Sequence, residues 1–361
     1  MKLLVGLVGV VACALLAPGG FAADLPDADD AGADTQYAVV LAYHHISSTT
    51  PAATSVTPRR FEQHLDYIAD NGFRVWSLER LVTALRAGEP VPRKVVALTF
   101  DDAYQSVQSE AWPRLRARGW PFTVFVHTEA ADRGAAPYMG WSQIRELAAA
   151  GVGIGNHSVS HGHLVRGSAA DARADITAAQ QRFAAELGAE PRLFAWPYGE
   201  YTSALADVLD DLDLIGFGQH SGAVGAGADF GGLPRFPLAT GLDDLDRLAT
   251  ALQTRPLPVS ASPEGPAVLA PDDVRPTLEI RLGRGRFRAD ALNCFATGQG
   301  RMTLEWLDRE AGRARIQPSQ DLGAGRTKYN CTAPHVTEPG VYYWWSYLLM
   351  KPGADGGWYD G

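Results

Sequence analysis

Two adjacent carboxylates, Asp101 and Asp102, directly follow a run of apolar and β-branched residues at 95–100. Such a run is typical of a buried strand, which would deliver both acids to the rim of a sheet or barrel. Neighbouring side chains on an extended chain point to opposite sides, so one carboxylate can bind a metal ion while the other accepts a proton. The pair is a weak signal alone, because two aspartates after a strand also form turns or helix caps.

A pair of imidazoles strengthens this interpretation. His157 and His161 lie four residues apart and follow a second short apolar run at 151–155. Two histidines and one carboxylate are a common ligand set for a divalent metal ion, and they leave coordination positions open for water and substrate. His163, two residues beyond His161, is an alternative second ligand.

Reactive residue types recur at the ends of other predicted strands. In a parallel βα architecture the loops after the strands form one face, and catalytic groups collect there. The sequence therefore predicts a single polar face built from five strand ends, which carry Tyr43-His44-His45, Asp101-Asp102, His157 with His161, Trp196-Pro197-Tyr198-Gly199 and Gln219-His220.

The frame for these residues is an alternation of strands and helices over residues 37–253. Short apolar runs predict strands at 39–43, 94–100, 122–127, 152–155, 193–196 and 214–217. Amphipathic stretches predict helices at 57–70, 77–86, 103–118, 142–150, 168–187, 201–211 and 242–252. This order predicts an α/β fold, a distorted (β/α) barrel of about seven units.

A change of composition separates a smaller C-terminal region. Residues 254–276 hold six prolines and lack apolar periodicity, which predicts a linker. Residues 277–361 predict a small all-β, sandwich-like domain with strands at 277–282, 286–296, 302–307, 327–331 and 341–350. The aromatic run at 341–347 is a candidate glycan-binding face, although alternation along a strand favours core packing for half of its rings.

The amino terminus predicts export. Residues 1–22 contain Lys2, an apolar core at 3–17 and a small-x-small cleavage site, and the apolar run is too short for a membrane span. Residues 23–36 predict a flexible leader. The protein would be periplasmic or extracellular, with lipoprotein anchoring through Cys13 as an alternative. Of three cysteines, Cys294 and Cys331 lie outside the signal and predict a disulfide, with two free thiols as the alternative.

Charge limits the partners of the chain. The formal net charge is −9, and basic residues neither dominate nor cluster, which argues against nucleic-acid binding. An acidic surface also disfavours a polyanionic substrate and is compatible with a neutral or cationic one.

Three ordered motifs resemble those of polysaccharide deacetylases, carbohydrate esterase family 4. They are Thr99-Phe100-Asp101-Asp102, His157-Ser158-Val159-Ser160-His161 and Phe194-Ala195-Trp196-Pro197-Tyr198-Gly199. Ala42-Tyr43-His44-His45 further resembles the exported poly-β-1,6-N-acetylglucosamine deacetylase branch, in which the catalytic histidine precedes the two aspartates. The resemblance covers about residues 37–252 and implies an enzyme that removes N-acetyl groups from an N-acetylglucosamine polymer.

The resemblance also implies a role for each matching residue. Asp101 would be the general base and His44 the general acid. The metal ligands would be Asp102, His157 and His161, holding zinc or alternatively nickel, cobalt or iron. The backbone N–H of Tyr198 would donate to the developing oxyanion. Pro197, Trp196 and Trp141 are further candidates for substrate contact.

Some roles stay open. Many relatives carry an arginine that orients the base within the third motif, where this chain has Ala195-Trp196, so Arg192 or Arg235 would have to replace it. A structural role is favoured for His45, and His127 and His220 are not expected to touch the site. Two other functions fit the same motifs: a non-catalytic glycan-binding protein and an O-acetyl esterase acting on polysaccharide.

Overall fold

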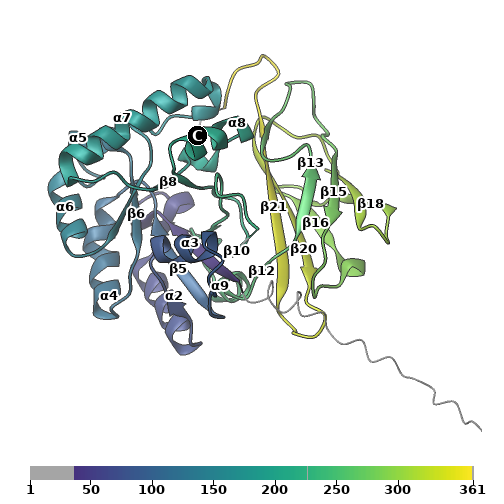
Figure 1. Ribbon diagram of the computed structural model, residues 1–361, viewed down its shortest axis with the longest axis horizontal. Coiled ribbons are helices and arrows are strands. Elements are labelled where there is room, and N and C mark those ends of the chain that lie inside the picture. Colours follow the sequence, from purple (N-terminus) through teal and green to yellow (C-terminus); the bar gives the residue numbers. More distant parts are fainter. Residues whose placement is uncertain (1–35, 226, 360–361) are drawn as a thin grey trace, which may run out of the picture.

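The computed structural model describes residues 36–225 and 227–359. The expected signal peptide, Cys13 and nearly all of the expected leader therefore lie outside the described residues. Figure 1 shows an α/β part, which holds the first two thirds of the chain, packed against a part built from strands. Within the described ranges, no helix combines the length and the apolar character needed to cross a membrane.

A curled, mainly parallel sheet forms the centre of the α/β part. Its order is β10-β1-β5-β6-β7-β8-β9, with β4 paired to β5 and β11 paired to β1. Only β10 runs antiparallel to its neighbour among the described pairs of this sheet. The strands are β1 (Tyr37–Tyr43), β4 (Arg74–Val75), β5 (Val95–Phe100), β6 (Thr123–Val126), β7 (Gly153–Asn156), β8 (Leu193–Ala195), β9 (Ile215–Phe217), β10 (Val224–Gly225) and β11 (Phe236–Pro237).

This sheet is a curled half-barrel, which confirms in part the distorted (β/α) barrel expected from the sequence. No regular strand pairing joins β9 to β1 in the described ranges. The segment 233–237 runs between them instead: Leu233 bridges to Phe217 of β9, and Phe236 pairs with Leu41 of β1. Pro234, which lies between these two pairings, lacks an N–H donor for a continuous ladder. The segment therefore lacks the pattern of a regular strand.

Helices flank this sheet and connect its strands, as the alternating sequence predicts (Figure 1). The expected helix at 103–118 is divided into a π-helical turn (Val107–Ala111) and α4, and α5 was not anticipated. The α-helices are α2 (Pro58–Asp70), α3 (Leu78–Arg86), α4 (Trp112–Ala117), α5 (Thr128–Arg133), α6 (Trp141–Ala149), α7 (Ala169–Leu187), α8 (Ser203–Asp211) and α9 (Leu245–Leu252).

Local sequence signals account for several of these boundaries. The side chain of Thr57 accepts a hydrogen bond from the backbone N–H of Arg60, and Pro58 occupies the first turn of α2. Ser168 and Asp171 form a reciprocal capping box at the start of α7. All six residues of β5 are buried, as expected of a central parallel strand covered on both faces.

Residues 255–351 form strands in two further sheets. One has the order β12-β21-β20-β16-β17 with β14 paired to β21, and the other has the order β13-β15-β19-β18. A disulfide between Cys294 and Cys331 joins β16 to β20, which confirms that expectation. The strands are β12 (Arg255–Pro256), β13 (Val259–Ser262), β14 (Ala267–Val268), β15 (Leu278–Leu282), β16 (Asn293–Ala296), β17 (Gly300–Arg301), β18 (Thr303–Asp308), β19 (Arg313–Gln317), β20 (Gly325–Pro334) and β21 (Tyr342–Lys351).

The segment expected to be a linker contains structure of its own. Within residues 254–276, β12 and β14 pair with β21, and β13 pairs with β15. Because β12 and β13 lie at sheet edges, where proline is tolerated, the high proline content does not prevent pairing. The exact division of the chain into domains stays a prediction. A separate short pair, β2 (His45–Ile46) with β3 (Ser55–Val56), follows β1.

Candidate active site

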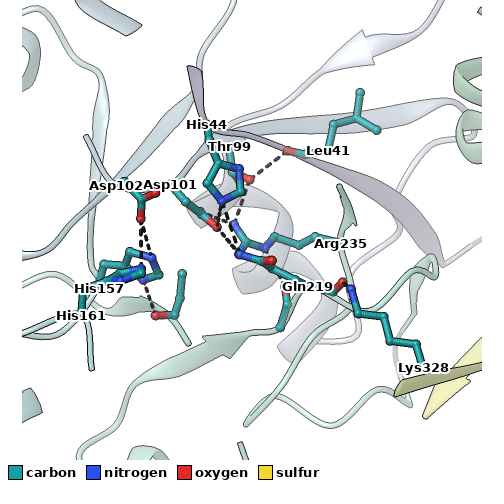
Figure 2. A network of polar contacts seen from close by, with 12 residues as sticks. Leu41, His44, Thr99, Asp101, Asp102, His157, His161, Gln219, Arg235 and Lys328 are labelled. Carbon is teal, nitrogen blue, oxygen red and sulfur yellow. Dashed lines mark hydrogen bonds and ion pairs between the residues drawn. The ribbon is translucent and has the colours of Figure 1, made fainter. Parts of the chain in front are cut away.

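Asp102, His157 and His161 come together at the carboxyl ends of β5 and β7 (Figure 2). Nε2 of His157 lies 3.2 Å and Nε2 of His161 lies 3.1 Å from Oδ1 of Asp102. Asp102 and His157 are buried, while His161 is partly exposed. The three residues that the sequence singled out as a ligand set are therefore one cluster in space.

The hydrogen bonding of His157 suits a metal ligand. Its Nδ1 lies 2.7 Å from the carbonyl oxygen of Ala195, so the proton of the neutral ring belongs on Nδ1 and the lone pair on Nε2. That lone pair faces Oδ1 of Asp102, and neither buried atom has a hydrogen-bond partner among the described residues. Two converging acceptors without a donor between them form the arrangement that a divalent cation satisfies.

The backbone at this cluster adopts conformations that side-chain-bearing residues seldom occupy. Asp102, Ser158, His161 and Tyr198 have φ angles of 68°, 70°, 52° and 58°. Local hydrogen bonds hold the histidine turn, because the side chain of Ser158 accepts from the backbone N–H of His161 at 2.9 Å. Strained residues of this kind concentrate at functional sites, where the surrounding structure fixes them.

Asp101 points away from Asp102 and forms a buried ion pair with Arg235. Nη1 and Nη2 of Arg235 lie 2.7 Å and 2.8 Å from the two carboxylate oxygens, and both residues have an exposed fraction of 0%. Burial alone would raise the pKa of Asp101, but the charge of Arg235 more than offsets it, aided by His44 and His157, and the pKa is lowered. Asp101 is thus an ionised carboxylate at neutral pH.

Arg235 resolves the question of which arginine reaches Asp101. Its Nε donates to the carbonyl of Gly218 and its Nη1 to the hydroxyl of Thr99, so the guanidinium is fixed on several sides. Arg192, the other candidate, pairs with Asp213 at the surface. The arginine missing from the third motif is therefore replaced from the segment that runs between β9 and β1.

His44 and Gln219 complete the group around Asp101. Nε2 of His44 lies 3.9 Å from Oδ2 of Asp101. The side-chain amide of Gln219 lies between them, with its Nε2 3.3 Å from Oδ2 of Asp101 and 3.5 Å from Nε2 of His44 (Figure 2). The expected acid and base therefore lie side by side, next to the cluster of Asp102.

The loop after β8 places Tyr198 beside the cluster. The Tyr198 and His161 ring centroids are 4.7 Å apart, and His163 stacks on Tyr198 at 4.0 Å. Nδ1 of His163 lies 2.7 Å from Oε2 of Glu200. His163 therefore supports the Tyr198 loop, and the three-residue cluster contains His161 instead.

Trp196 and Trp141, the aromatic candidates for substrate contact, are both buried. Trp196 is fully buried and its Nε1 donates to the carbonyl of Gly231 at 2.7 Å, because alternation at the end of β8 directs it into a core below α8. Trp141 is 7% exposed, and its Nε1 donates to Asp132. Contact of either ring with a sugar stays a prediction, and the burial of both rings favours packing. Pro197 is buried as well.

Three further histidines are buried near the site. His45 stacks on Tyr104 with ring centroids 3.4 Å apart, and burial lowers its pKa to about 4. Burial lowers the pKa of His127 and of His220 to about 3, so both are neutral. His127 packs 5.2 Å from the His161 ring but lies outside the ligand cluster.

Two residues near the reactive groups received no role from the sequence. Burial raises the pKa of Tyr104, and the charge of Asp102 raises it further. The phenol of Tyr104 therefore lies close to this carboxylate. Its only sequence signal is its place two residues after Asp102. The only sequence signal for Gln219 is its place after a predicted strand, and this signal is weaker still.

Comparison with known proteins identifies the family that the segment with this cluster resembles. Residues 88–216 match the family model for polysaccharide deacetylases. The poly-β-1,6-N-acetyl-D-glucosamine N-deacetylase of Escherichia coli (strain K12) is 25% identical over 224 residues, which cover 50% of this chain and 33% of that protein. Matches to curated relatives span between 33% and 57% of their lengths.

Solved structures agree at the level of the fold. IcaB from Ammonifex degensii has 26% identity and a TM-score of 0.55, over 60% of this chain and 97% of that one. The Streptococcus pyogenes deacetylase PplD has 24% identity and a TM-score of 0.56, over 60% of this chain and 99% of that one. The family match includes the two aspartates and both clustered histidines, so the segment 88–216 belongs to the polysaccharide deacetylase family.

Proposed function

We propose that this protein is a metal-dependent hydrolase that removes N-acetyl groups from N-acetylglucosamine units of a polysaccharide. The observation that carries the proposal is the pairing of two carboxylates with different partners. Asp102 faces two imidazoles, while Asp101 is held ionised by Arg235 beside His44. The name of the Escherichia coli relative supports the choice of substrate.

Asp102, His157 and His161 would hold the cation. Two imidazoles and one carboxylate suit zinc, with nickel, cobalt and iron as alternatives. A divalent ion bound there supplies a polarised acetyl carbonyl and a water molecule of lowered pKa. Asp101 is not among these three groups, and Arg235 holds both of its oxygens instead.

Asp101 would act as the general base. Arg235 keeps its pKa low, so the carboxylate is ionised and ready to accept a proton from the attacking water at neutral pH. The same guanidinium fixes the orientation of both oxygens, which removes the need to position the base during the reaction.

His44 and Tyr198 would handle the other charges of the reaction. His44 directly follows β1 and has a partly exposed side chain, so its imidazole can protonate the departing amine. The backbone N–H of Tyr198 would donate to the oxyanion of the tetrahedral intermediate, and the loss of one such donor costs about 10²–10³ in rate.

Export to the periplasm or beyond, expected from residues 1–22, belongs to the same proposal.

Acetate release from defined oligomers tests this function. We expect protein loaded with Zn²⁺ or Co²⁺ to release acetate from β-1,6- or β-1,4-linked N-acetylglucosamine oligomers, and a chelator to stop the release. Asp101→Asn is the matched control, because it should retain the metal and lose at least about 10² in kcat. Release from O-acetylated glycans alone would make the protein an esterase. Glycan binding without turnover in both forms would make it a lectin.

A further inference from the structure

The outer face of β20 and β21 lies against the loops that carry the active site. Along β20, Tyr329 and Cys331 point into the core between the C-terminal sheets, while Arg326 and Lys328 alternate to the opposite face. Figure 1 shows these two long strands on the side of the C-terminal region that faces the half-barrel. The family match ends at residue 216 and does not include this contact.

Lys328 reaches from β20 to the loop after β9. Its Nζ donates to the backbone carbonyl of Gln219 at 2.5 Å (Figure 2). Two residues on, the carbonyl of Ser221 accepts a hydrogen bond from the hydroxyl of Ser346 on β21, also at 2.5 Å. The loop that presents Gln219 is thus fixed from the C-terminal sheet at two successive places.

Gln219 is confined from the opposite side as well. Gly199, in the loop of Tyr198, approaches so closely that a Cβ atom there would meet the backbone nitrogen of Gln219 at 2.6 Å. From this backbone position, the side chain of Gln219 points between Asp101 and His44. Its amide bridges the expected base and acid only while its backbone keeps this place.

The charge of Lys328 is disfavoured where this contact is made. Burial, together with the charges of Arg326, Arg247 and Arg235, lowers the pKa of Lys328 to about 8. An ammonium group with these neighbours makes folding less favourable than an uncharged side chain of the same length would. A role in holding the Gln219 carbonyl accounts for a lysine at this position.

We infer that Lys328 is a positioning residue of the active site, which holds Gln219 so that the Gln219 amide bridges Asp101 and His44. The C-terminal region then completes the catalytic centre and is more than an attachment to it. This inference deepens the proposed function and rests on the acid and base assigned there.

Arg326 makes a second, independent contact from the same face of β20. Its Nη1 lies 3.4 Å from Oε1 of Glu200, whose other oxygen binds His163 beneath the Tyr198 ring. The guanidinium carbon lies 5.3 Å from the centre of the Tyr198 ring. One strand thus supports both the loop of the expected oxyanion donor and the loop of Gln219.

The test compares Lys328→Met with Lys351→Met in the full chain. Lys351 is the matched control: it is buried on the neighbouring strand β21, and its Nζ also donates to a backbone carbonyl, that of Pro271. We expect Lys328→Met to lose about tenfold or more in kcat with KM little changed, as the loss of supporting contacts commonly does. Lys351→Met should keep the kcat of the unmodified protein.

Two further variants separate positioning from general damage. Lys328→Arg can still donate to the Gln219 carbonyl and should recover part of the lost kcat. Gln219→Leu should reproduce the loss, and combining it with Lys328→Met should add little, because both act through one bridge. If Lys328→Met and Lys351→Met have equal kcat, the inference is wrong. It is also wrong if the losses of kcat in Lys328→Met and Gln219→Leu simply add in the double variant.

Hydrogen exchange gives a reading that does not depend on turnover. Backbone amides at 217–221 should exchange faster in Lys328→Met than in the unmodified protein. In Lys351→Met their exchange rates should be unchanged. If the unmodified protein releases no acetate, the proposed function fails while this measurement still tests the contact. Unchanged exchange at 217–221 in Lys328→Met would overturn the inference by itself.

Discussion

Arg235 and Asp101 form two parallel hydrogen bonds in the interior of the half-barrel, although 134 residues separate them. Arg235 lies in the segment between Leu233, which bridges to β9, and Phe236, which pairs with β1. The same short segment therefore links the two ends of the curled sheet and orients the expected base. The segment that pairs with β9 and β1 must therefore be in place for Arg235 to orient Asp101.

Removal of this arginine should harm both stability and catalysis. Arg235→Met leaves Asp101 as an unpaired buried charge, so we expect a loss of about 3–5 kcal/mol in the free energy of unfolding. The pKa of Asp101 would rise, and less of the base would be ionised at neutral pH. Arg192→Met, at the exposed pair with Asp213, should change stability by less than about 1 kcal/mol. Urea denaturation and acetate release measure both; equal behaviour of the two variants would contradict the prediction.

Metal affinity should distinguish the two histidines that compete for the second imidazole position. His161→Ala removes one of the three converging groups, and we expect it to weaken Zn²⁺ binding by about 10-fold or more. His163→Ala removes a stacking partner of Tyr198 and a hydrogen bond to Glu200 but no group of the cluster, and it should keep the affinity of the unmodified protein. Equilibrium dialysis with metal analysis reports both. If His163→Ala weakened Zn²⁺ binding and His161→Ala did not, His163 would be the metal ligand instead of His161.

Trp196 should prove structural. Trp196→Phe removes the hydrogen bond to the Gly231 carbonyl and leaves that acceptor unsatisfied in the core, which should cost about 1–3 kcal/mol of stability. Since the ring is fully buried, we expect KM for glycan oligomers to stay the same. Chemical denaturation and steady-state kinetics test this. A raised KM at unchanged stability would instead support the sugar-contact role expected from the sequence.

Lys328 should give the protein a rise in stability in the alkaline range. Its pKa is lowered from 10.5 to about 8 by burial and by neighbouring arginines. Between these values the unfolded chain holds a proton that the folded protein has released, so the free energy of unfolding increases with pH. Relative to Lys328→Met, we expect a gain of roughly 2 kcal/mol between about pH 8 and pH 10. Lys351→Met should follow the unmodified protein. A flat difference across this range, measured by urea denaturation, would refute the prediction.

The sequence by itself determined the elements and the core of the site. The buried run before Asp101 predicts β5, and the caps at Thr57 and Ser77 predict the starts of two helices, because these signals depend only on neighbouring residues. Asp102 and the two spaced histidines could be assigned to one cluster, since parallel strands deliver their carboxyl ends to the same edge.

Only the tertiary structure decided what surrounds this core. Arg235 and Lys328 reach the site from an irregular segment and from a strand of the C-terminal region, and no local pattern specifies such a contact. Trp196 shares a motif with Tyr198, and alternation after β8 gives its side of the chain, but only the tertiary structure shows that residues of α8 cover that side. Short-range signals fix which element a residue belongs to. Which distant side chain meets it is determined when the sheets and loops pack against each other.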